Sequence, residues 1–402
     1  MSEPTSWSPQ QAAALDKVAA WLADPHAKQV FRLFGYAGTG KTTLARHLAL
    51  TGARWPLFAA YTGKAASVLR EKGCPGASTL HSLMYNVRDR SRDLLNELEL
   101  TLRGLDPKHP DYAEAKAARD EELDKVRRPW FHVNENSIIR NCDLLVCDEV
   151  SMVDQRIGKD MESFQKKILV LGDPAQLPPV RGGGYFTEHT PDVLLTEIHR
   201  QAADNPLLRW ATLARTGQVI PYADMGLVKK FKREMVNDEW FSKAGQLLCG
   251  KNETRYDLNR RMRKILGRES TFPVHGDRLV MLSNDHKLGI LNGTLATCMG
   301  PAEQDESDPT VVWMNILYEK TRIDSQRYDA GPFLGKTEPR DGTRRLMADY
   351  GYALTVHKAQ GSQWPSVVLY DDGFGKREPL TRNRWLYTAI TRAEKHLYIV
   401  TS

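Results

Sequence analysis

The stretch GYAGTGKTT at residues 35–43 decides the fold of this chain. It follows a β-type run, VFRLF (30–34), and leads into a helix-type run, TTLARHLAL (42–50). Strand, glycine-rich turn and helix in this order, with G-x-x-x-x-G-K-[ST] matched at every fixed position, predict a phosphate-binding loop in an α/β domain. A chance glycine-rich turn is the alternative, but it does not account for the complete pattern.

The residue types in this loop suit a nucleoside triphosphate with Mg²⁺. Glycines let backbone N–H groups surround phosphate oxygens, and the following helix directs the positive end of its dipole at the anion. Lys41 would neutralise the β- and γ-phosphates, and the Thr42 hydroxyl would bind the metal ion. The ATP-binding residues expected here are Gly35, Gly38, Thr39, Gly40, Lys41, Thr42 and Thr43.

Short β-type runs alternate with helix-forming segments along most of the chain, which indicates parallel sheets with crossover helices. Two series of runs occur, so we expect two tandem α/β domains, residues 1–200 and 201–402. The first series is QVFRLF (29–34), PLFAAY (56–61), DLLVC (143–147), KILVL (167–171) and DVLL (192–195); the second is QLLC (246–249), RLVML (278–282), SVVLY (366–370) and HLYIV (396–400).

Two segments interrupt this alternation, and each is predicted to be an insertion into its domain. Residues 86–132 are highly charged and mostly helix-forming, with a proline-containing break at LDPKHP (105–110). Residues 295–347 are rich in Asp, Glu, Pro, Gly and Arg and contain the β-type stretch TVVWMNILY (310–318). We favour a small β-barrel for this second insertion over an irregular excursion.

Composition restricts the possible domain number, partners and location of the protein less strictly than the motifs do. The 402 residues suffice for two or three domains. The formal net charge of +6 is compatible with a nucleic-acid partner and equally with an ordinary basic protein. The five cysteines form no C-x-x-C pair, which argues against a zinc site or a disulfide framework. Without a signal pattern or an apolar run of membrane-spanning length, we expect a cytoplasmic protein with no membrane partner.

Acidic and amide side chains follow two later strands, where they would meet the phosphate-binding loop. In DLLVCDEVSM (143–152), Asp148 would hold Mg²⁺ through its water shell and Glu149 would polarise the attacking water. ATP hydrolysis is therefore favoured over nucleotide binding alone. In LVLGDPAQLPPV (169–180), the Gln176 amide could contact the γ-phosphate. The prolines there could equally mark no more than a loop.

GYAGTGKT, DEVSM and GDPAQLPPV in this order resemble the superfamily 1 helicases of the 5′-to-3′ branch that contains Dda and RecD-like enzymes. The resemblance implies two RecA-like motor domains with ATP between them, in an ATP-dependent DNA helicase that moves 5′-to-3′ on single strands. Further motifs keep the family's order over nearly the whole chain. They are SPQQ (8–11), YTGKAA (61–66), STLHSLM (78–84), LLTEIHRQ (194–201), LNRRMR (258–263), GDRLVM…LNGT (276–294), YALTVHKAQGSQWPSVVL (352–369) and LYTAITRAEKHLYIV (386–400).

The resemblance also implies roles for single residues. Gln11 would read adenine, and Arg200 and Arg392 would be arginine fingers that stabilise charge on the γ-phosphoryl oxygens. A core position for His357 and a helix cap for Ser362 remain alternatives to DNA contact. The neutral and cationic donors expected to grip the DNA backbone are Thr62, Lys64, Thr79 and His81 in the first domain and Thr355, His357, Lys358, Gln360 and Ser362 in the second.

In this family an aromatic residue on a pin separates the two DNA strands. The corresponding interval here is the 86–132 insertion, where Trp130 and Phe131 could stack on a base at the junction or pack the insertion onto the core. We expect a monomer that meets single-stranded DNA, duplex junctions and replication or repair proteins.

Two rival functions remain. The first is a nucleic-acid translocase or remodeller, on DNA or RNA, that does not unwind. The second is a P-loop kinase or small-molecule ATPase, and such an enzyme would lack the TVHKAQG…AITRAEK pair (355–361 and 389–395).

Overall fold

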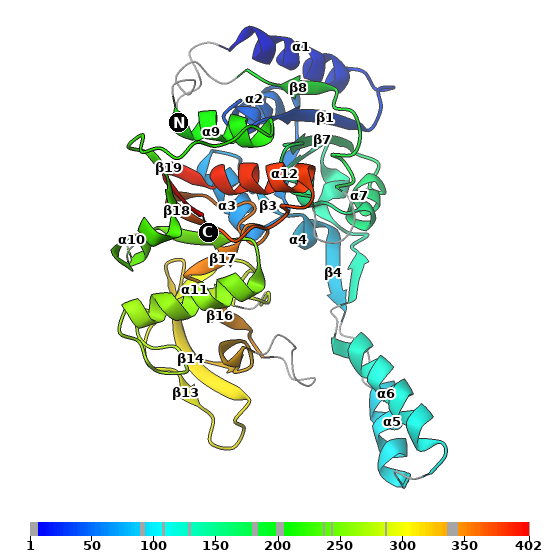
Figure 1. Ribbon diagram of the computed structural model, residues 1–402. Coiled ribbons are helices and arrows are strands. Elements are labelled where there is room, and N and C mark those ends of the chain that lie inside the picture. Colours follow the sequence, from blue (N-terminus) through cyan, green and yellow to red (C-terminus); the bar gives the residue numbers. More distant parts are fainter. Residues whose placement is uncertain are drawn as a thin grey trace.

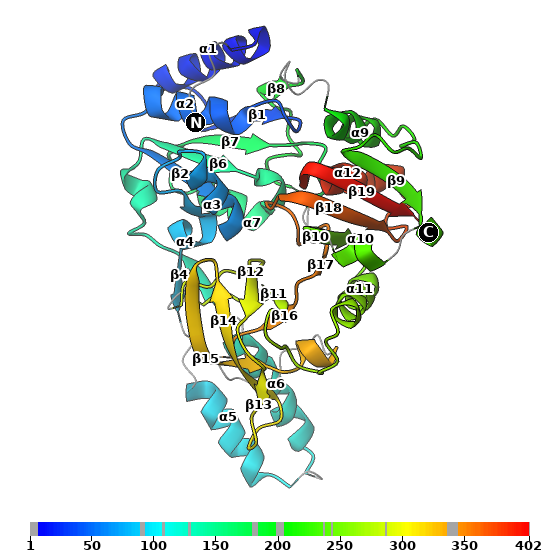
Figure 2. The same cartoon turned by 90° about the vertical axis from the view of Figure 1, so that its left-hand side faces the viewer.

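The computed structural model describes residues 7–88, 93–106, 109–127, 130–178, 184–197, 205–235, 238–242, 244–285, 288–335 and 345–401. Two parallel sheets, a six-stranded antiparallel sheet and a two-stranded antiparallel ribbon that carries a projecting helical hairpin occur in this part of the chain (Figures 1 and 2). Four 3₁₀ turns connect the elements: η1 (Ile138–Asn141), η2 (Val150–Met152), η3 (Arg233–Met235) and η4 (Pro332–Leu334).

The first sheet is six-stranded and wholly parallel, in the order β3-β2-β6-β7-β1-β8. Strands β1, β6 and β7 are almost wholly buried because helices cover both faces of the sheet. One face packs on α1 (Pro9–Ala23), α2 (Lys41–Gly52) and α3 (Gly63–Glu71), the other on α4 (Leu80–Met84) and α7 (Gln155–Glu162). The strands are β1 (Val30–Gly35), β2 (Pro56–Ala60), β3 (Ser78–Thr79), β6 (Leu144–Asp148), β7 (Lys167–Gly172) and β8 (Val193–Leu195).

The second sheet has five parallel strands in the order β17-β10-β18-β19-β9. Helices α9 (Pro206–Arg215) and α12 (Pro379–Ile390) cover one face, and α11 (Asn252–Ile265) covers the other, with α10 (Asp238–Ser242) beside α11. Two RecA-like parallel sheets are thus present, as the alternation of runs predicts. The strands are β9 (Val228–Lys232), β10 (Gln246–Cys249), β17 (Ala353–Thr355), β18 (Trp364–Asp371) and β19 (Ala393–Thr401).

One expected strand of that sheet lies elsewhere. RLVML forms β11 (Arg278–Met281), which pairs antiparallel with β12 and β16 in the third sheet, so its assignment to the parallel series is wrong. This sheet closes on itself through a bridge between Tyr328 and Leu346, forming a small barrel that already begins at β11. Its other strands are β12 (Leu295–Cys298), β13 (Glu303–Gln304), β14 (Val311–Tyr318), β15 (Thr321–Asp329) and β16 (Ala348–Tyr350).

The charged insertion forms a two-stranded ribbon that carries a helical hairpin away from the first sheet (Figure 1). β4 (Tyr85–Arg88) pairs antiparallel with β5 (Trp130–Val133), and α5 (Asp93–Gly104) packs on α6 (Tyr112–Arg127). The helix-forming composition around LDPKHP therefore predicted both helices. No helix in the described residues is long and apolar enough to cross a membrane.

Candidate functional site

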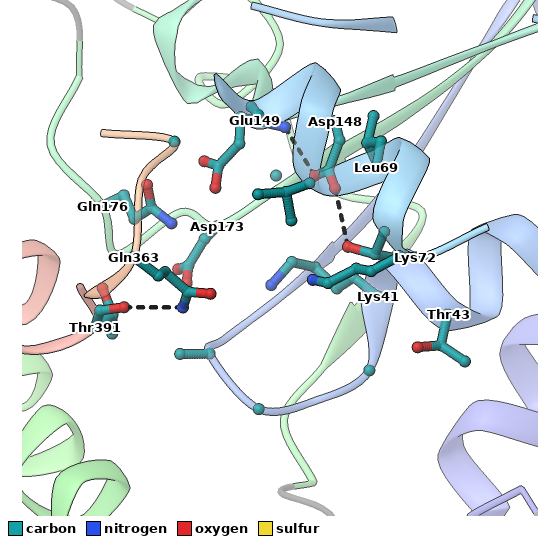
Figure 3. Close-up of a pocket in the computed structure, with 18 of the residues that line it drawn as sticks. Lys41, Thr43, Leu69, Lys72, Asp148, Glu149, Asp173, Gln176, Gln363 and Thr391 are labelled. Atoms are coloured by element: carbon teal, nitrogen blue, oxygen red, sulfur yellow. Dashed lines mark hydrogen bonds between the residues drawn. The ribbon is translucent and has the colours of Figure 1, made fainter. Parts of the chain in front are cut away.

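A cavity of about 340 Å³ lies between the two parallel sheets, at the carboxyl ends of β1, β6 and β7 (Figure 3). This volume falls at the lower end of the range typical of small-ligand sites. The first domain contributes Ala37, Gly38, Gly40, Lys41, Thr42, Thr43, Ala65, Val68, Leu69, Lys72, Asp148, Glu149, Gly172, Asp173 and Gln176, and the second contributes Gly361, Gln363, Thr391 and Arg392.

The glycine-rich loop adopts a conformation that only glycine takes readily. Gly38 and Gly40 have φ angles of 79° and 80°, and Gly40 caps the N-terminus of α2. Helix α2 therefore begins at the cavity, where the positive end of its dipole favours an anion. The Lys41 ammonium donates to the carbonyls of Gly35 (2.6 Å) and Tyr36 (3.1 Å), so it lies along the loop as a phosphate-neutralising cation would.

The acidic pair stands opposite the loop. The Thr42 hydroxyl donates to Asp148 Oδ2 at 2.9 Å, which places two hard oxygen donors side by side, a set that fits Mg²⁺. Glu149 has a φ of 56°, an uncommon backbone for a non-glycine residue, and its amide donates to Asp148 Oδ1 (2.8 Å). Burial raises the pKa of Glu149, while the positive charges of Arg392 and Lys41 oppose that rise.

Gln176 and Arg392 complete the cavity from opposite domains. The Gln176 side chain is buried, and its Oε1 has no hydrogen-bond partner within the described residues. Arg392 follows α12 and is 3% exposed; its guanidinium donates only to neutral oxygens of Ser362, Thr388 and Thr391. Among the described residues no carboxylate forms an ion pair with Arg392, although its positive charge acts on Glu149. A buried cation and an orphaned amide both fit an anionic ligand with polar edges.

The structure adds residues that sequence reasoning did not select. Asp173 is 3% exposed, and burial raises its pKa despite a hydrogen bond from Tyr387. Lys72 at the end of α3 directs its ammonium into the cavity, as Lys41 does (Figure 3). Asp173 stands in the quoted GDPAQL motif and could have been found there. Lys72 carries no motif signal, since only the packing of α3 brings it to the cavity.

Three of the expected ATP-binding residues, Gly35, Thr39 and Gln11, do not line this cavity. Gln11 is buried, its Nε2 donates to the Thr39 carbonyl (3.0 Å) and its Oε1 accepts from the Ser8 amide (3.1 Å). The Gln11 amide thus links the N-cap of α1 to the phosphate-binding loop, and its adenine-reading role stays a prediction. Arg200 lies outside the described residues.

The expected DNA-gripping residues gather at the carboxyl edges of both sheets. In the first domain Thr62 caps α3 and Lys64 lies within it, while Thr79 caps α4 and His81 lies within that helix. A Cβ on Gly361 would stand 2.7 Å from Thr62 Oγ1, so the second-domain loop after β17 meets α3 directly. That loop carries His357, Lys358, Gln360 and Ser362 beyond Thr355, the last residue of β17. The two halves therefore form one continuous edge.

Burial divides these DNA candidates. Lys358 is exposed and His357 half-buried, whereas the Thr355, Gln360 and Ser362 side chains are buried. Gln360 Nε2 donates to the Leu177 carbonyl at 2.8 Å, which argues against a DNA contact for this amide. Burial lowers the pKa of His357 and is the main cause of the lowered pKa of His81, so both imidazoles are neutral donors at neutral pH.

The strand-separation candidates Trp130 and Phe131 occupy β5 of the projecting ribbon. Their side chains lie outside what the structure describes. Their backbone position, at the base of the hairpin, is compatible with either expected role.

Two parallel RecA-like sheets around a shared phosphate-binding cavity define a P-loop motor fold. Residues 6–233 match the AAA domain family, and residues 350–400 match the UvrD-like helicase C-terminal domain. The first match covers more than half of the sequence, and the chain belongs to the AAA domain family.

Two DNA helicases are among the known proteins that are similar to this chain. The ATP-dependent RecD2 DNA helicase of Deinococcus radiodurans is 26% identical over 97% of this chain and 48% of its own length. The ATP-dependent DNA helicase dda of Enterobacteria phage T4 is 28% identical over 46% of this chain and 37% of its own length. The chain thus spans half or less of the length of these relatives. They confirm the resemblance to Dda and RecD-like enzymes.

Solved structures share the fold. Bacteroides Pif1 bound to single-stranded DNA superposes with a TM-score of 0.56 at 17% identity, covering 98% of this chain and 92% of that one. Pif1 helicase from Bacteroides in complex with ADP-AlF3 and single-stranded DNA gives 0.52 at 18% identity, covering 99% and 93%. At these identities the likeness shows the two-domain fold alone.

Proposed function

We propose that this chain is an ATP-dependent DNA helicase that translocates 5′-to-3′ on single-stranded DNA and unwinds duplex. One observation carries the proposal: Lys41, Asp148, Glu149 and Gln176 of one domain line the same cavity as Arg392 of the other. A nucleotide bound there touches both domains, so its hydrolysis changes their relative position, which is the basic step of a hinge-type motor.

ATP and Mg²⁺ are the proposed cofactors. Thr42 and Asp148 would hold the metal, whose charge would help to neutralise the phosphates. Lys41 would bind the phosphate oxygens, Glu149 would take a proton from the attacking water, and Gln176 would orient that water or the γ-phosphate. Arg392, and Arg200 by family resemblance, would stabilise charge on the transferred phosphoryl group.

Single-stranded DNA is the proposed track. The edge formed by α3, α4 and the loop after β17 presents hydroxyls, neutral imidazoles and the ammonium groups of Lys64 and Lys358. Such groups hold phosphates and sugars without reading bases. The RecD2 and dda relatives are named as DNA helicases, which supports DNA over RNA as the track.

A strand-displacement assay tests the proposal. DNA and RNA duplexes with a 5′ or a 3′ single-stranded tail are offered with Mg-ATP. We expect unwinding of 5′-tailed DNA only. Lys41→Ala should abolish hydrolysis and unwinding while single-strand binding persists, because Lys41 lies in the nucleotide cavity. DNA-stimulated hydrolysis without unwinding would favour the translocase or remodeller, and hydrolysis indifferent to nucleic acid would favour a small-molecule ATPase.

A further inference from the structure

The second domain holds both nucleotide loops of the first domain through one side chain, Tyr387 on α12. The Tyr387 hydroxyl accepts a hydrogen bond from the Ala37 amide of the phosphate-binding loop at 2.8 Å. The same hydroxyl donates to Asp173 Oδ2 at 2.5 Å. One oxygen thus joins the loop after β1 to the loop after β7, and it comes from the opposite domain.

Neighbouring contacts strengthen this link on both sides. Tyr36 precedes Ala37, and the centroid of its ring lies 3.8 Å from the guanidinium carbon of Arg215 on α9. This is a cation–π contact between the two domains. Beyond Asp173, the Leu177 amide donates to Thr388 Oγ1 (2.9 Å), and the Leu177 carbonyl accepts from Gln360. The segment 173–177, which carries Gln176, is therefore held at both ends by the second domain.

The environment of Tyr387 makes its hydroxyl an effective link. Tyr387 is 2% exposed, and burial raises its pKa well above the usual value, so the group stays protonated and can donate. Asp173 is equally buried, and a buried carboxylate that loses a hydrogen-bond donor bears a desolvation penalty. Ala37 would likewise lose the acceptor of its amide. Removing one oxygen therefore disturbs both loops at once.

We propose that Tyr387 is a positioning residue for ATP hydrolysis. Its hydroxyl holds the phosphate-binding loop and the Gln176 segment in the correct relative position when the second domain docks. It acts through Ala37 and Asp173 and need not touch the nucleotide. This inference rests on the proposed ATPase function and deepens it: docking of the second domain then supplies Arg392 and also orders the first-domain loops that face it.

Tyr387→Phe tests this inference because it removes only the hydroxyl. Misplacement of reacting groups by about 1 Å can cost on the order of 100-fold in rate, so we expect kcat to fall about 10- to 100-fold. Affinity for ADP should change less than about threefold, since Lys41, Thr42 and the other loop residues remain. Affinity for ADP with aluminium fluoride, which mimics the transferred phosphoryl group, should fall in parallel with kcat.

Tyr328→Phe is the matched control. Tyr328 is fully buried in the barrel core, and its hydroxyl has no hydrogen-bond partner among the described residues, so the same deletion there should leave kcat unchanged. Thr388→Val provides a second variant, because it removes one tether of the Gln176 segment at nearly constant volume. We expect it to lower kcat by about three- to tenfold, the effect of one hydrogen bond.

The outcomes separate the two claims. An unaltered chain that hydrolyses ATP, with Tyr387→Phe equally fast, overturns the positioning role and leaves the proposed function standing. Equal losses of ADP and analogue affinity with a lowered unfolding midpoint would also overturn it, because a merely structural residue behaves so. An unaltered chain that binds nucleotide but hydrolyses none overturns the proposed function and the role of Tyr387 with it.

Discussion

At the scale of single residues, the cavity concentrates buried charge. Asp173 is a buried carboxylate and Glu149 a half-buried one, and the cations Lys41 and Arg392 line the same cavity. Glu149 also holds a left-handed backbone conformation that its side-chain type disfavours. Strain and desolvation at one residue lower stability, and both cluster at functional positions.

The raised pKa of Glu149 leads to a prediction about pH. If its carboxylate accepts the proton of the attacking water, ATP hydrolysis requires the ionised form. Because burial raises this pKa, the rate should fall on acidification at a pH above the ordinary glutamate range. A kcat–pH profile measures this. Glu149→Gln should be slower by about 100-fold or more and lack that acid limb, whereas the exposed Glu188→Gln should keep it. An unchanged profile in Glu149→Gln would exclude the role.

At the scale of elements, α11 is tied to the barrel by buried ion pairs. The Arg255 guanidinium contacts Asp349 Oδ2 on β16 at 2.6 Å, with both side chains about 5% exposed or less. Arg263 on the same helix pairs with Asp277, which is fully buried and also contacts Arg268. These pairs hold the barrel against the second parallel sheet, whose β17 follows β16 along the chain.

Arg255→Ala should therefore destabilise the protein strongly. It leaves Asp349 buried without its cation, a change that costs about 3–5 kcal/mol in free energy of unfolding. Arg322→Ala is the matched control, because Arg322 pairs with Asp324 on the exposed surface of β15 and should cost at most about 1 kcal/mol. Urea unfolding measures both. Equal effects of the two substitutions would contradict the buried-pair argument.

The ribbon of β4 and β5 allows a prediction about strand separation. If Phe131 stacks on a base at the duplex junction, Phe131→Ala should slow unwinding several-fold, since a stacked base contributes about 1–3 kcal/mol. DNA-stimulated ATP hydrolysis should persist, because β5 lies outside the nucleotide cavity. Parallel assays of unwinding and ATP hydrolysis show whether Phe131 has this role. Loss of both activities together would indicate that Phe131 packs the insertion onto the core.

At the scale of the whole molecule, the two domains meet at the nucleotide cavity and along the proposed DNA edge. Tyr387 and Thr388 accept hydrogen bonds across the boundary, Gln360 donates one, and Gly361 packs on Thr62. Gln360 belongs to the loop that also carries His357 and Lys358. Leu177, which follows the cavity residue Gln176, thus accepts a hydrogen bond directly from the proposed DNA-gripping loop.

Arg392→Lys tests whether hydrolysis depends on the second domain. Lysine retains the charge but lacks the planar fork, so we expect kcat to fall by about 10³-fold. ADP affinity should change little, because the phosphate-binding loop is intact. Arg384→Lys on α12, the helix that precedes Arg392, lies outside the cavity; it is the control and should hydrolyse ATP normally. Steady-state kinetics and ADP titration provide the measurements, and an equal rate in both variants would refute the finger role.

The sequence by itself determined the phosphate-binding loop, five of the six strands of the first sheet and the order of the helicase motifs. Each of these depends on residues close together along the chain, and local patterns of glycine, β-type residues and charge are sufficient to predict them. Asp148, Glu149, Gln176 and Arg392 were predicted for the same reason, and they line one cavity.

Only the tertiary structure decided which sheet β11 joins, where the Gln360 amide points, that Lys72 lines the nucleotide cavity and that Tyr387 contacts two of its loops. The residues of a β-type run do not specify the strand with which it pairs. A buried polar side chain forms its hydrogen bond only when distant segments of the chain pack together. Ala37 and Tyr387 stand 350 residues apart in the chain, yet one hydrogen bond joins them. Contacts of that separation arise from the packing of the two domains, because no local pattern encodes them.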